Sequence, residues 1–319
     1  MENKIKITIL DSATLGKDID LEPLYKLGDV CKYDMTSSEV VSVRIEDCDA
    51  VVLNKVKLNG SNLSAAKKLK LICVAATGFD NIDIDYCREN NIAVCNVAGY
   101  SSSSVAQLTA SMVLAMSVHL KEYMEYVNTG KYTESGVQNR LEPVYHELCG
   151  MTWGIVGYGT IGKQVSKVAE AFGCNVIVNK RNFEEGIECV DIDELCRRSD
   201  IITLHTPLNN GTRNLINEER ISMMKKSVLL VNTARGAVVD EEAVTNAVVS
   251  GRIAGFGCDV YSQEPFPENH PYNRIKHLSN VLLTPHMAWG AYEARNRCLS
   301  EVAKNIEAFF AGDDRNRIV

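Results

Sequence analysis

Short runs of β-branched and other apolar residues recur along the chain, and stretches with helical spacing of apolar residues separate them. Strands that alternate with helices form parallel sheets, because each helix returns the chain to the edge where the next strand starts. The expected strands are residues 5–10, 50–53, 71–74, 92–94, 153–156, 175–178, 201–204, 228–231, 254–256 and 281–283. The sequence therefore predicts an α/β protein with parallel sheets.

Two longer stretches, residues 101–126 and residues 291–310, have the apolar spacing of amphipathic helices. The first repeats Val105, Leu108 and Met112 at steps of three and four, and the second repeats Val302 and Ile306 in the same way. A chain of 319 residues is also longer than one usual domain of ~100 to 200 residues. Two domains are therefore expected.

The composition excludes several classes of protein. With 34 basic and 41 acidic residues, the net charge is -7, so a nucleic acid is not expected as a partner. No stretch approaches the ~18 to 20 apolar residues of a membrane span, and the chain starts with a strand pattern instead of a secretory signal. The eleven cysteines include no Cys-x-x-Cys pair, which argues against a metal site and a disulfide framework. We expect a cytoplasmic protein without metal.

A glycine-rich turn follows the expected strand at residues 153–156. It has the pattern Gly-x-Gly-x-x-Gly, with Gly157, Gly159 and Gly162, and a helical pattern begins directly after it. In dinucleotide-binding folds the first glycine forms the turn, the second lets the backbone approach the pyrophosphate, and the third lets helix and strand pack closely. The helix N-terminus attracts the anion. This segment, with Thr160 and Ile161, is therefore predicted to bind a dinucleotide.

The residues after the next strand indicate which dinucleotide is preferred. An acidic residue there binds the ribose 2′-hydroxyl of NAD, whereas a cation accommodates the 2′-phosphate of NADP. Residues 179–182 contain no carboxylate, and Lys180 and Arg181 are both basic. We therefore expect NADP to be favoured over NAD. The alternative is that both are ordinary solvated surface cations.

Three residues with catalytic potential follow later strands. Arg235 can bind a carboxylate, His286 can act as a general acid, and Glu264 can keep the imidazolium protonated. Ligands of open α/β sheets bind at the carboxyl ends of strands, so these residues should converge near the glycine turn. Taken singly, they could instead be a salt-bridge partner, a turn residue and an exposed loop acid.

Four motifs together resemble the D-isomer-specific 2-hydroxyacid dehydrogenase family. They are the glycine turn, the Asn-Thr-Ala-Arg-Gly stretch that ends at Gly236, the stretch from Asp259 to Pro265, and Thr284-Pro285-His286. Trp289 and the stretch Asn54-Lys55-Val56 are similar to the glycerate dehydrogenase or hydroxypyruvate reductase branch of that family.

The resemblance implies two doubly wound, Rossmann-like domains that are linked by two crossing helices. Residues 1–99 plus 288–319 would form the substrate domain, and residues 100–287 the dinucleotide-binding domain. Arg235 would anchor and polarise the keto acid, His286 would donate the proton, and Glu264 would hold the histidine. Further cofactor contacts would be Ser102, Thr206, Pro207, Ala234 and, at the nicotinamide carboxamide, Asp259; substrate contacts would be Lys55, Ala76, Thr77 and Gly78.

The implied activity is the reduction of a small 2-keto acid, hydroxypyruvate or glyoxylate being favoured, to the D-2-hydroxy acid by a nicotinamide cofactor. The resemblance also implies a homodimer. Two alternatives remain open: a reductase of aromatic or branched 2-keto acids, and a dinucleotide-sensing regulator with the same fold.

Overall fold

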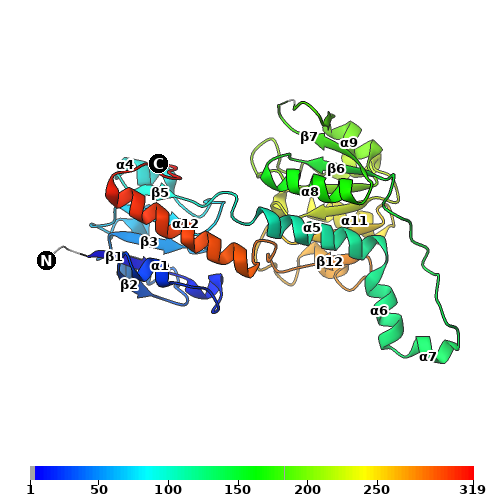
Figure 1. Ribbon diagram of the computed structural model, residues 1–319, viewed down its shortest axis with the longest axis horizontal. Coiled ribbons are helices and arrows are strands. Elements are labelled where there is room, and N and C mark those ends of the chain that lie inside the picture. The colour runs from blue at the N-terminus through cyan, green and yellow to red at the C-terminus, as the bar shows by residue number, and fades with distance from the viewer. Residues whose placement is uncertain (1–3, 183) are drawn as a thin grey trace. The chain divides into compact units, whose positions relative to one another are not determined.

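The computed structural model describes residues 4–182 and 184–319. The chain divides into two compact units, Met1–Ser101 with Trp289–Val319, and Ser102–Ala288. Each unit is a parallel sheet covered by helices on both faces (Figure 1). The predicted fold class, two doubly wound parallel-sheet domains, is confirmed.

The first unit has a five-stranded sheet with the order β2-β1-β3-β4-β5. One face packs against α1 and α12, and the other face packs against α2, α3 and α4. The strands are β1 (Ile5–Ile9), β2 (Gly28–Lys32), β3 (Ala50–Leu53), β4 (Leu71–Val74) and β5 (Ala93–Cys95). The helices are η1 (Ser12–Leu15), α1 (Glu22–Tyr25), α2 (Val41–Ile45), α3 (Gly60–Leu63), α4 (Ile84–Glu89) and α12 (Tyr292–Ala311).

The second unit has a seven-stranded sheet with the order β12-β11-β10-β9-β6-β7-β8. Helices α9, α10 and α11 cover one face, and α5 and α8 cover the other. The strands are β6 (Thr152–Val156), β7 (Asn175–Asn179), β8 (Glu188–Cys189), β9 (Ile201–Leu204), β10 (Leu229–Asn232), β11 (Gly255–Cys258) and β12 (Val281–Leu283). The helices are α5 (Ser102–Ser117), α6 (Leu120–Asn128), α7 (Lys131–Ser135), α8 (Thr160–Ala171), α9 (Ile192–Arg198), α10 (Glu218–Met223), η2 (Gly236–Val238), α11 (Glu241–Val249) and η3 (Pro271–Arg274).

The strand order of the second unit predicts where a ligand would bind. Chain order runs outward in both directions from the pair β6–β9, which makes this pair the topological switch point. Ligands of such sheets bind in the crevice at the carboxyl ends of the strands beside the switch point. The glycine turn follows β6 directly and therefore lies at this edge.

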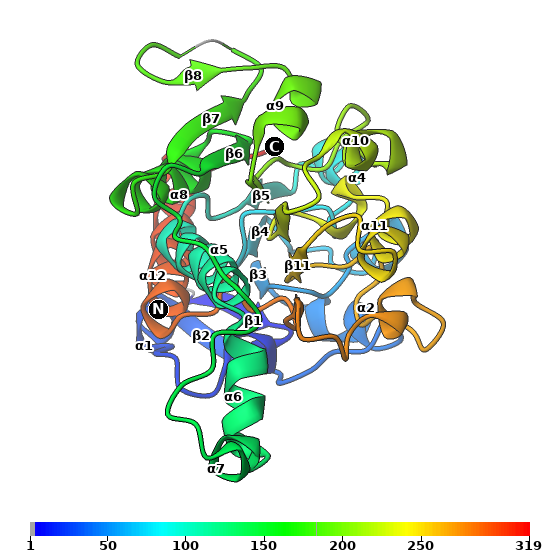
Figure 2. The same ribbon diagram turned by 90° about the vertical axis from the view of Figure 1, so that its right-hand side faces the viewer.

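The long helix expected over residues 101–126 is two helices. His119 adopts a left-handed backbone conformation with φ of 50°, which a right-handed helix cannot include, and α5 and α6 meet at an angle of 63°. The apolar spacing continues across this break, so periodicity alone does not reveal it. Figure 2 shows α6 and α7 extending away from the sheet of their own unit.

Within the described residues, 4–182 and 184–319, no single helix is long and apolar enough to cross a membrane. Helices α5 and α6 meet that criterion only when they are taken together as a bent pair.

Two strands were missing from the expected set. β2 lies at the edge of its sheet and has the sequence Gly-Asp-Val-Cys-Lys, which lacks a run of apolar residues. β8 is also an edge strand and is only two residues long. Edge strands bury less side-chain surface, so their sequences carry a weaker apolar pattern.

Candidate active site

Three neighbouring strands of the second unit end at the same level. Asn232 of β10 pairs with Cys258 of β11, and Cys258 pairs with Leu283 of β12. Arg235 and His286 each follow three residues after their strands, and Glu264 lies in the loop after β11. The sheet therefore delivers all three predicted catalytic side chains from one edge.

His286 and Glu264 form a close pair. The distance from His286 Nδ1 to Glu264 Oε2 is 2.6 Å. An ionised carboxylate only accepts hydrogen bonds, so Nδ1 carries a proton and donates it to Glu264. The other oxygen of Glu264 accepts from the backbone N–H of Tyr261 at 2.9 Å. The carboxylate thus holds its own loop with one oxygen and the imidazole with the other, and its contact with the ring is made through Nδ1 of His286.

Asp259 holds the turn that carries His286. Its side chain is fully buried and accepts hydrogen bonds from Thr284 Oγ1 at 2.5 Å, Met287 N at 2.9 Å and Ala288 N at 2.8 Å. Burial raises the pKa of Asp259, and these hydrogen bonds oppose that effect. His286 itself has a left-handed φ of 52°, a conformation that needs such support. Both oxygens of Asp259 accept hydrogen bonds from the histidine turn, and the nicotinamide contact that the resemblance implies for Asp259 stays a prediction.

The arginine segment packs directly on the loop that carries Glu264. A Cβ atom on Gly236 would lie 2.0 Å from the backbone carbon of Tyr261 and 2.2 Å from the nitrogen of Ser262. Only glycine allows this approach. Arg235 directly precedes it and donates from Nη1 to the backbone oxygen of Ala234 at 2.8 Å. The backbone around Arg235 is therefore held against the Glu264 loop.

A second histidine–glutamate pair, which the sequence did not suggest, anchors the same loop. His270 Nε2 lies 3.0 Å from Glu241 Oε2, and the two side chains are only 4% and 11% exposed. His270 Nδ1 accepts from the backbone N–H of Tyr272, so the ring proton is on Nε2 and is donated to Glu241. Glu241 Oε1 accepts from the backbone N–H of Ser262 at 2.8 Å. Glu241 and His270 are far apart in the sequence and belong to no motif, so only the fold brings them together.

The glycine turn has the geometry of a dinucleotide cradle. Gly157 has a φ of +91°, and a Cβ there would lie 2.6 Å from the His205 carbonyl oxygen. A Cβ on Gly162 would lie 2.2 Å from the carbonyl oxygen of Gly157, whereas a Cβ on Gly159 would meet no atom within 4 Å. The first and third glycines thus serve internal packing, and the second faces open space, where a ligand can approach. Thr160 begins α8 and its Oγ1 accepts from Ser102 Oγ at 3.2 Å.

The structure gives Lys180 an acidic partner that the sequence did not suggest. Residues 179–182 contain no carboxylate, but Glu184 lies outside that window and folds back onto the Lys180 ammonium. Glu184 also contacts Lys163 Nζ at 2.6 Å, and the two lysines lower the pKa of Glu184. Arg181 is exposed. Lys180 is therefore an ion-pair partner, not simply a solvated cation.

The other predicted site residues lie at strand ends of their own units. Thr206 and Pro207 follow β9 in the second unit. In the first unit, Ala76, Thr77 and Gly78 follow β4, and Lys55 follows β3. Thr77 Oγ1 donates to Val97 O at 3.0 Å, and the backbone N–H of Lys55 donates to buried Asp11 at 2.6 Å.

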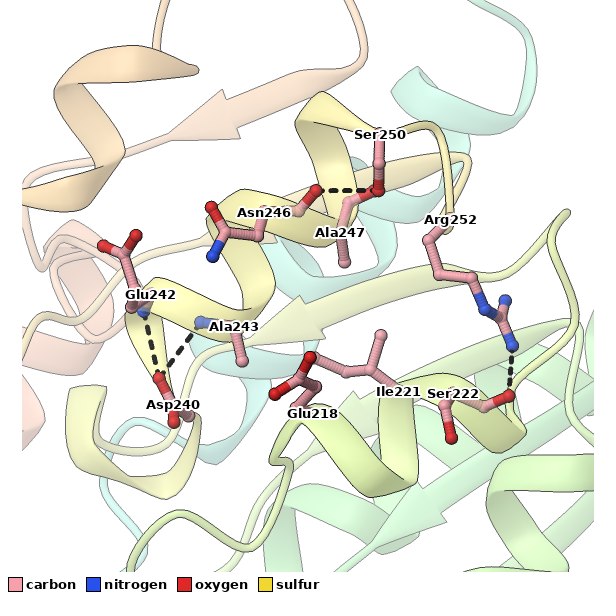
Figure 3. Close-up of a pocket in the computed structure, with 10 residues that line it drawn as sticks. All are labelled: Glu218, Ile221, Ser222, Asp240, Glu242, Ala243, Asn246, Ala247, Ser250 and Arg252. Atoms are coloured by element: carbon pink, nitrogen blue, oxygen red, sulfur yellow. Dashed lines mark hydrogen bonds between the residues drawn. The ribbon is translucent and has the colours of Figure 1, made fainter.

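A groove on the second unit contains none of these residues. It lies between α10 and α11 (Figure 3) and is lined by Glu218, Ile221, Ser222, Asp240, Glu242, Ala243, Asn246, Ala247, Ser250 and Arg252. Asp240 caps α11, and Arg252 donates to the Ser222 carbonyl oxygen at 2.6 Å. Arg252 thus links the end of α11 to α10, whereas Asp240 stabilises the first turn of α11. In the parts of the chain that the structure describes, no group of three or more His, Cys, Asp or Glu side chains is placed to hold a metal ion.

Known proteins share both the sequence and the fold. Residues 110–288 match the family model described as D-isomer specific 2-hydroxyacid dehydrogenase, NAD binding domain. The chain is 33% identical to a glycerate dehydrogenase from Methylorubrum extorquens, over 98% of each chain. It is also 33% identical to a hydroxypyruvate reductase from Blautia hydrogenotrophica, over 98% of this chain and 99% of that protein.

A solved structure extends the likeness to three dimensions. The D-lactate dehydrogenase from Aquifex aeolicus, complexed with NAD and lactic acid, has a TM-score of 0.84 and 32% identity, and the match covers 97% of this chain and 96% of that one. The family model covers more than half of the chain, and the matches to the relatives cover nearly all of it. This chain therefore belongs to the D-isomer-specific 2-hydroxyacid dehydrogenase family, in its glycerate dehydrogenase and hydroxypyruvate reductase branch.

Proposed function

We propose that the protein reduces a small 2-keto acid to the D-2-hydroxy acid with a reduced nicotinamide cofactor, and that hydroxypyruvate or glyoxylate is the substrate. The observation that carries the proposal is the in-register strand edge that presents Arg235 and the His286–Glu264 pair at the same edge of the sheet as the glycine turn. The names of the relatives support the substrate class.

The roles of the side chains follow from their chemistry. The bound cofactor supplies a hydride to the keto carbon, and the carbonyl electron pair moves onto the oxygen. His286 donates the Nε2 proton to that oxygen, and Glu264 stabilises the imidazolium before the transfer. The guanidinium of Arg235 binds the substrate carboxylate with two parallel hydrogen bonds and stabilises the developing charge.

The cofactor would be held by the second unit. Gly157, Gly159 and Gly162 form the turn for the pyrophosphate, with Thr160 and Ile161 at the start of α8 and Ser102 at the start of α5. Thr206, Pro207 and Ala234 would contact it from the neighbouring strand ends. The loop Ala76, Thr77 and Gly78, with Lys55, would bind the substrate carboxylate, a role that the family resemblance supports.

The preferred cofactor is NADPH. Lys180 and Lys163 supply two ammonium groups beside the glycine turn, and Arg181 adds a third cation on the exposed loop. Cations attract the 2′-phosphate that distinguishes NADPH from NADH. Replacing Lys180 by Asp should therefore shift the ratio of catalytic efficiencies towards NADH.

We further propose a homodimer. The segment of α6, α7 and the loop that follows exposes apolar side chains, namely Leu120, Met124, Val127, Tyr132, Val137, Leu141, Val144 and Tyr145. Exposed apolar surface of this extent is typical of a protein–protein interface. All eleven cysteines are free thiols, as in proteins of a reducing compartment, which supports a cytoplasmic enzyme.

The test is a steady-state comparison of hydroxypyruvate, glyoxylate, phenylpyruvate and 2-ketoisocaproate, each with NADH and NADPH. We expect the two small keto acids to have the highest kcat/KM. Higher kcat/KM with phenylpyruvate or 2-ketoisocaproate would identify a reductase of larger keto acids. Cofactor binding without turnover of any of the four would instead identify a dinucleotide-sensing regulator.

A further inference from the structure

Two lysines from different elements meet on one carboxylate beside the glycine turn. Lys163 lies in the first turn of α8, Lys180 follows β7, and Glu184 lies in the loop beyond. Glu184 Oε1 contacts Lys163 Nζ at 2.6 Å, and Glu184 Oε2 contacts Lys180 Nζ. The Lys180 side chain is only 18% exposed. Each oxygen of Glu184 therefore has its own ammonium partner.

The same two lysines also face one aromatic ring. Their Nζ atoms each lie 5.7 Å from the centre of the Tyr158 ring, which belongs to the glycine turn itself. A ring face attracts cations at this distance. The lysines are thus held near the turn by Tyr158 as well as by Glu184.

This cluster lies where a dinucleotide-binding fold recognises the adenosine ribose. Val156 at the end of β6 pairs with Asn179 at the end of β7, so the glycine turn and Lys180 leave neighbouring strands at the same level. In such folds the residue that follows the second strand faces the ribose 2′ position. Two ammonium groups on one anion are also the arrangement that binds a phosphate monoester.

We propose that Glu184 is an internal anion that occupies the binding position of the cofactor's 2′-phosphate and thereby sets the preference between NADPH and NADH. The inference rests on the proposed function and identifies a specificity-determining residue of that site. The 2′-phosphate carries about 1.5 to 2 negative charges at neutral pH, against one on Glu184. It therefore displaces Glu184 from Lys163 and Lys180. NADH has a hydroxyl at that position and leaves the contacts of Glu184 in place.

The proposal predicts that Glu184 weakens NADPH binding, because the phosphate has to break two ion pairs before it can form its own. Removing the charge with Glu184→Gln should increase NADPH affinity by about five- to tenfold, the effect of one charge-assisted contact after screening. NADH affinity should change less than about twofold. Isothermal titration calorimetry of the whole protein measures both affinities without turnover.

Glu185→Gln is the matched control. Glu185 is exposed and adjacent in sequence, so its replacement removes the same charge from the same loop. If Glu185→Gln raises NADPH affinity as much as Glu184→Gln, the effect is general electrostatics and the proposal is wrong. An unchanged NADPH affinity in Glu184→Gln also refutes it. Lys163→Gln should do the opposite of Glu184→Gln and lower NADPH affinity while NADH affinity stays constant.

A probe without nicotinamide separates this inference from the proposed reaction. Adenosine 2′,5′-bisphosphate carries the 2′-phosphate, and adenosine 5′-monophosphate lacks it. Glu184→Gln should raise the affinity for the bisphosphate and not for the monophosphate, even if no 2-keto acid is turned over. An equal increase in affinity for both ligands would mean that the 2′-phosphate does not bind at Lys163 and Lys180, and would contradict the proposal.

Discussion

His286 Nδ1 lies 2.6 Å from Glu264 Oε2, and this contact joins the loop after β11 to the turn after β12. Asp259 accepts three hydrogen bonds from the turn that carries His286, and Glu264 accepts one from the imidazole itself. The two carboxylates thus hold both the backbone and the ring of His286, and a positioned side chain is what general-acid catalysis requires.

Replacing His286 with Ala should lower kcat by about 10² to 10⁴, the usual contribution of a general acid. NADPH affinity should stay within about twofold of the wild type. Steady-state kinetics and calorimetry measure the two quantities. His277→Ala is the control, because His277 is exposed and is not one of the predicted site residues. Full activity in His286→Ala would remove this residue from the mechanism.

Replacing Glu264 with Gln should move the loss of reductase activity to lower pH. In the proposed mechanism His286 donates a proton to the substrate, and a neutral amide stabilises the positive imidazolium less than a carboxylate does. The alkaline fall in kcat should therefore begin earlier as pH rises. The measurement is kcat against pH for both proteins, and superimposable profiles would show that Glu264 does not act on the histidine.

Replacing Arg235 with Lys should lower kcat/KM severely although the charge is kept. An ammonium is a point charge and cannot form the two parallel hydrogen bonds that a guanidinium makes with a carboxylate. We expect a large rise in KM for the keto acid. Arg213→Lys, another arginine of the same unit, is a control for the substitution itself. An unchanged KM in Arg235→Lys would place the substrate carboxylate elsewhere.

Replacing His270 with Phe should lower both stability and kcat. His270 packs among the rings of Tyr261, Phe266 and Tyr272, which Phe can preserve, but Glu241 would lose the hydrogen bond from His270 and keep only those from Ser262. A hydrogen bond to a charged group contributes about 1.5 to 3 kcal/mol to the free energy of unfolding, so we expect a loss of that order. The loop that carries Glu264 also loses an anchor, so kcat should fall while NADPH affinity stays constant.

The control for His270→Phe is Arg274→Gln. Arg274 forms an exposed ion pair with Glu242 at 2.6 Å on the neighbouring position of α11. Exposed pairs contribute less than about 1 kcal/mol, so denaturant unfolding and kcat should hardly change. If His270→Phe behaves like this control, the buried pair does not position the loop.

Replacing His205 with Gln should make the protein more resistant to acid. Burial lowers the pKa of His205 to about 3, and its Nε2 atom has no hydrogen-bond partner among the residues that the structure describes. In the unfolded chain the pKa returns to 6.5. Below that pH the unfolded state binds a proton that the folded state does not. The free energy of unfolding therefore falls as pH decreases, by up to about 1.4 kcal/mol per pH unit.

Urea unfolding at several pH values between about 7 and 4 measures this slope, since the pKa difference acts in that range. The wild type should lose stability more steeply than His205→Gln. The exposed His277→Gln should keep the wild-type slope. Equal slopes for all three proteins would mean that His205 does not contribute to acid sensitivity.

The sequence predicts the parts of the fold that repeat a physical pattern. Strands β3, β4, β9 and β12 have the predicted bounds, because each is a short run of apolar residues, interrupted only by Thr203 in β9. Arg235, Glu264 and His286 could be proposed because strand ends of a parallel sheet share an edge.

What the sequence could not predict depends on single backbone angles or on tertiary contacts. The break at His119 depends on one left-handed residue within an unbroken apolar pattern. The contacts of Glu184 with Lys163 and of Glu241 with His270 form only after the chain has folded back. The positioning role of Asp259 similarly requires the turn after β12 to lie beside it.

Strands β10, β11 and β12 end in register, so the position of each catalytic side chain depends on how many residues separate it from the end of its strand. Adjacent strands of a sheet are about 4.8 Å apart, so the backbone positions of the site are spaced by the sheet itself. The crossover segments that join these strands do not determine this spacing. Their length can change over evolution, or by design, without altering the distance between the arginine, glutamate and histidine, provided that the strand register, the residues after each strand and the pair of Glu241 and His270 stay the same.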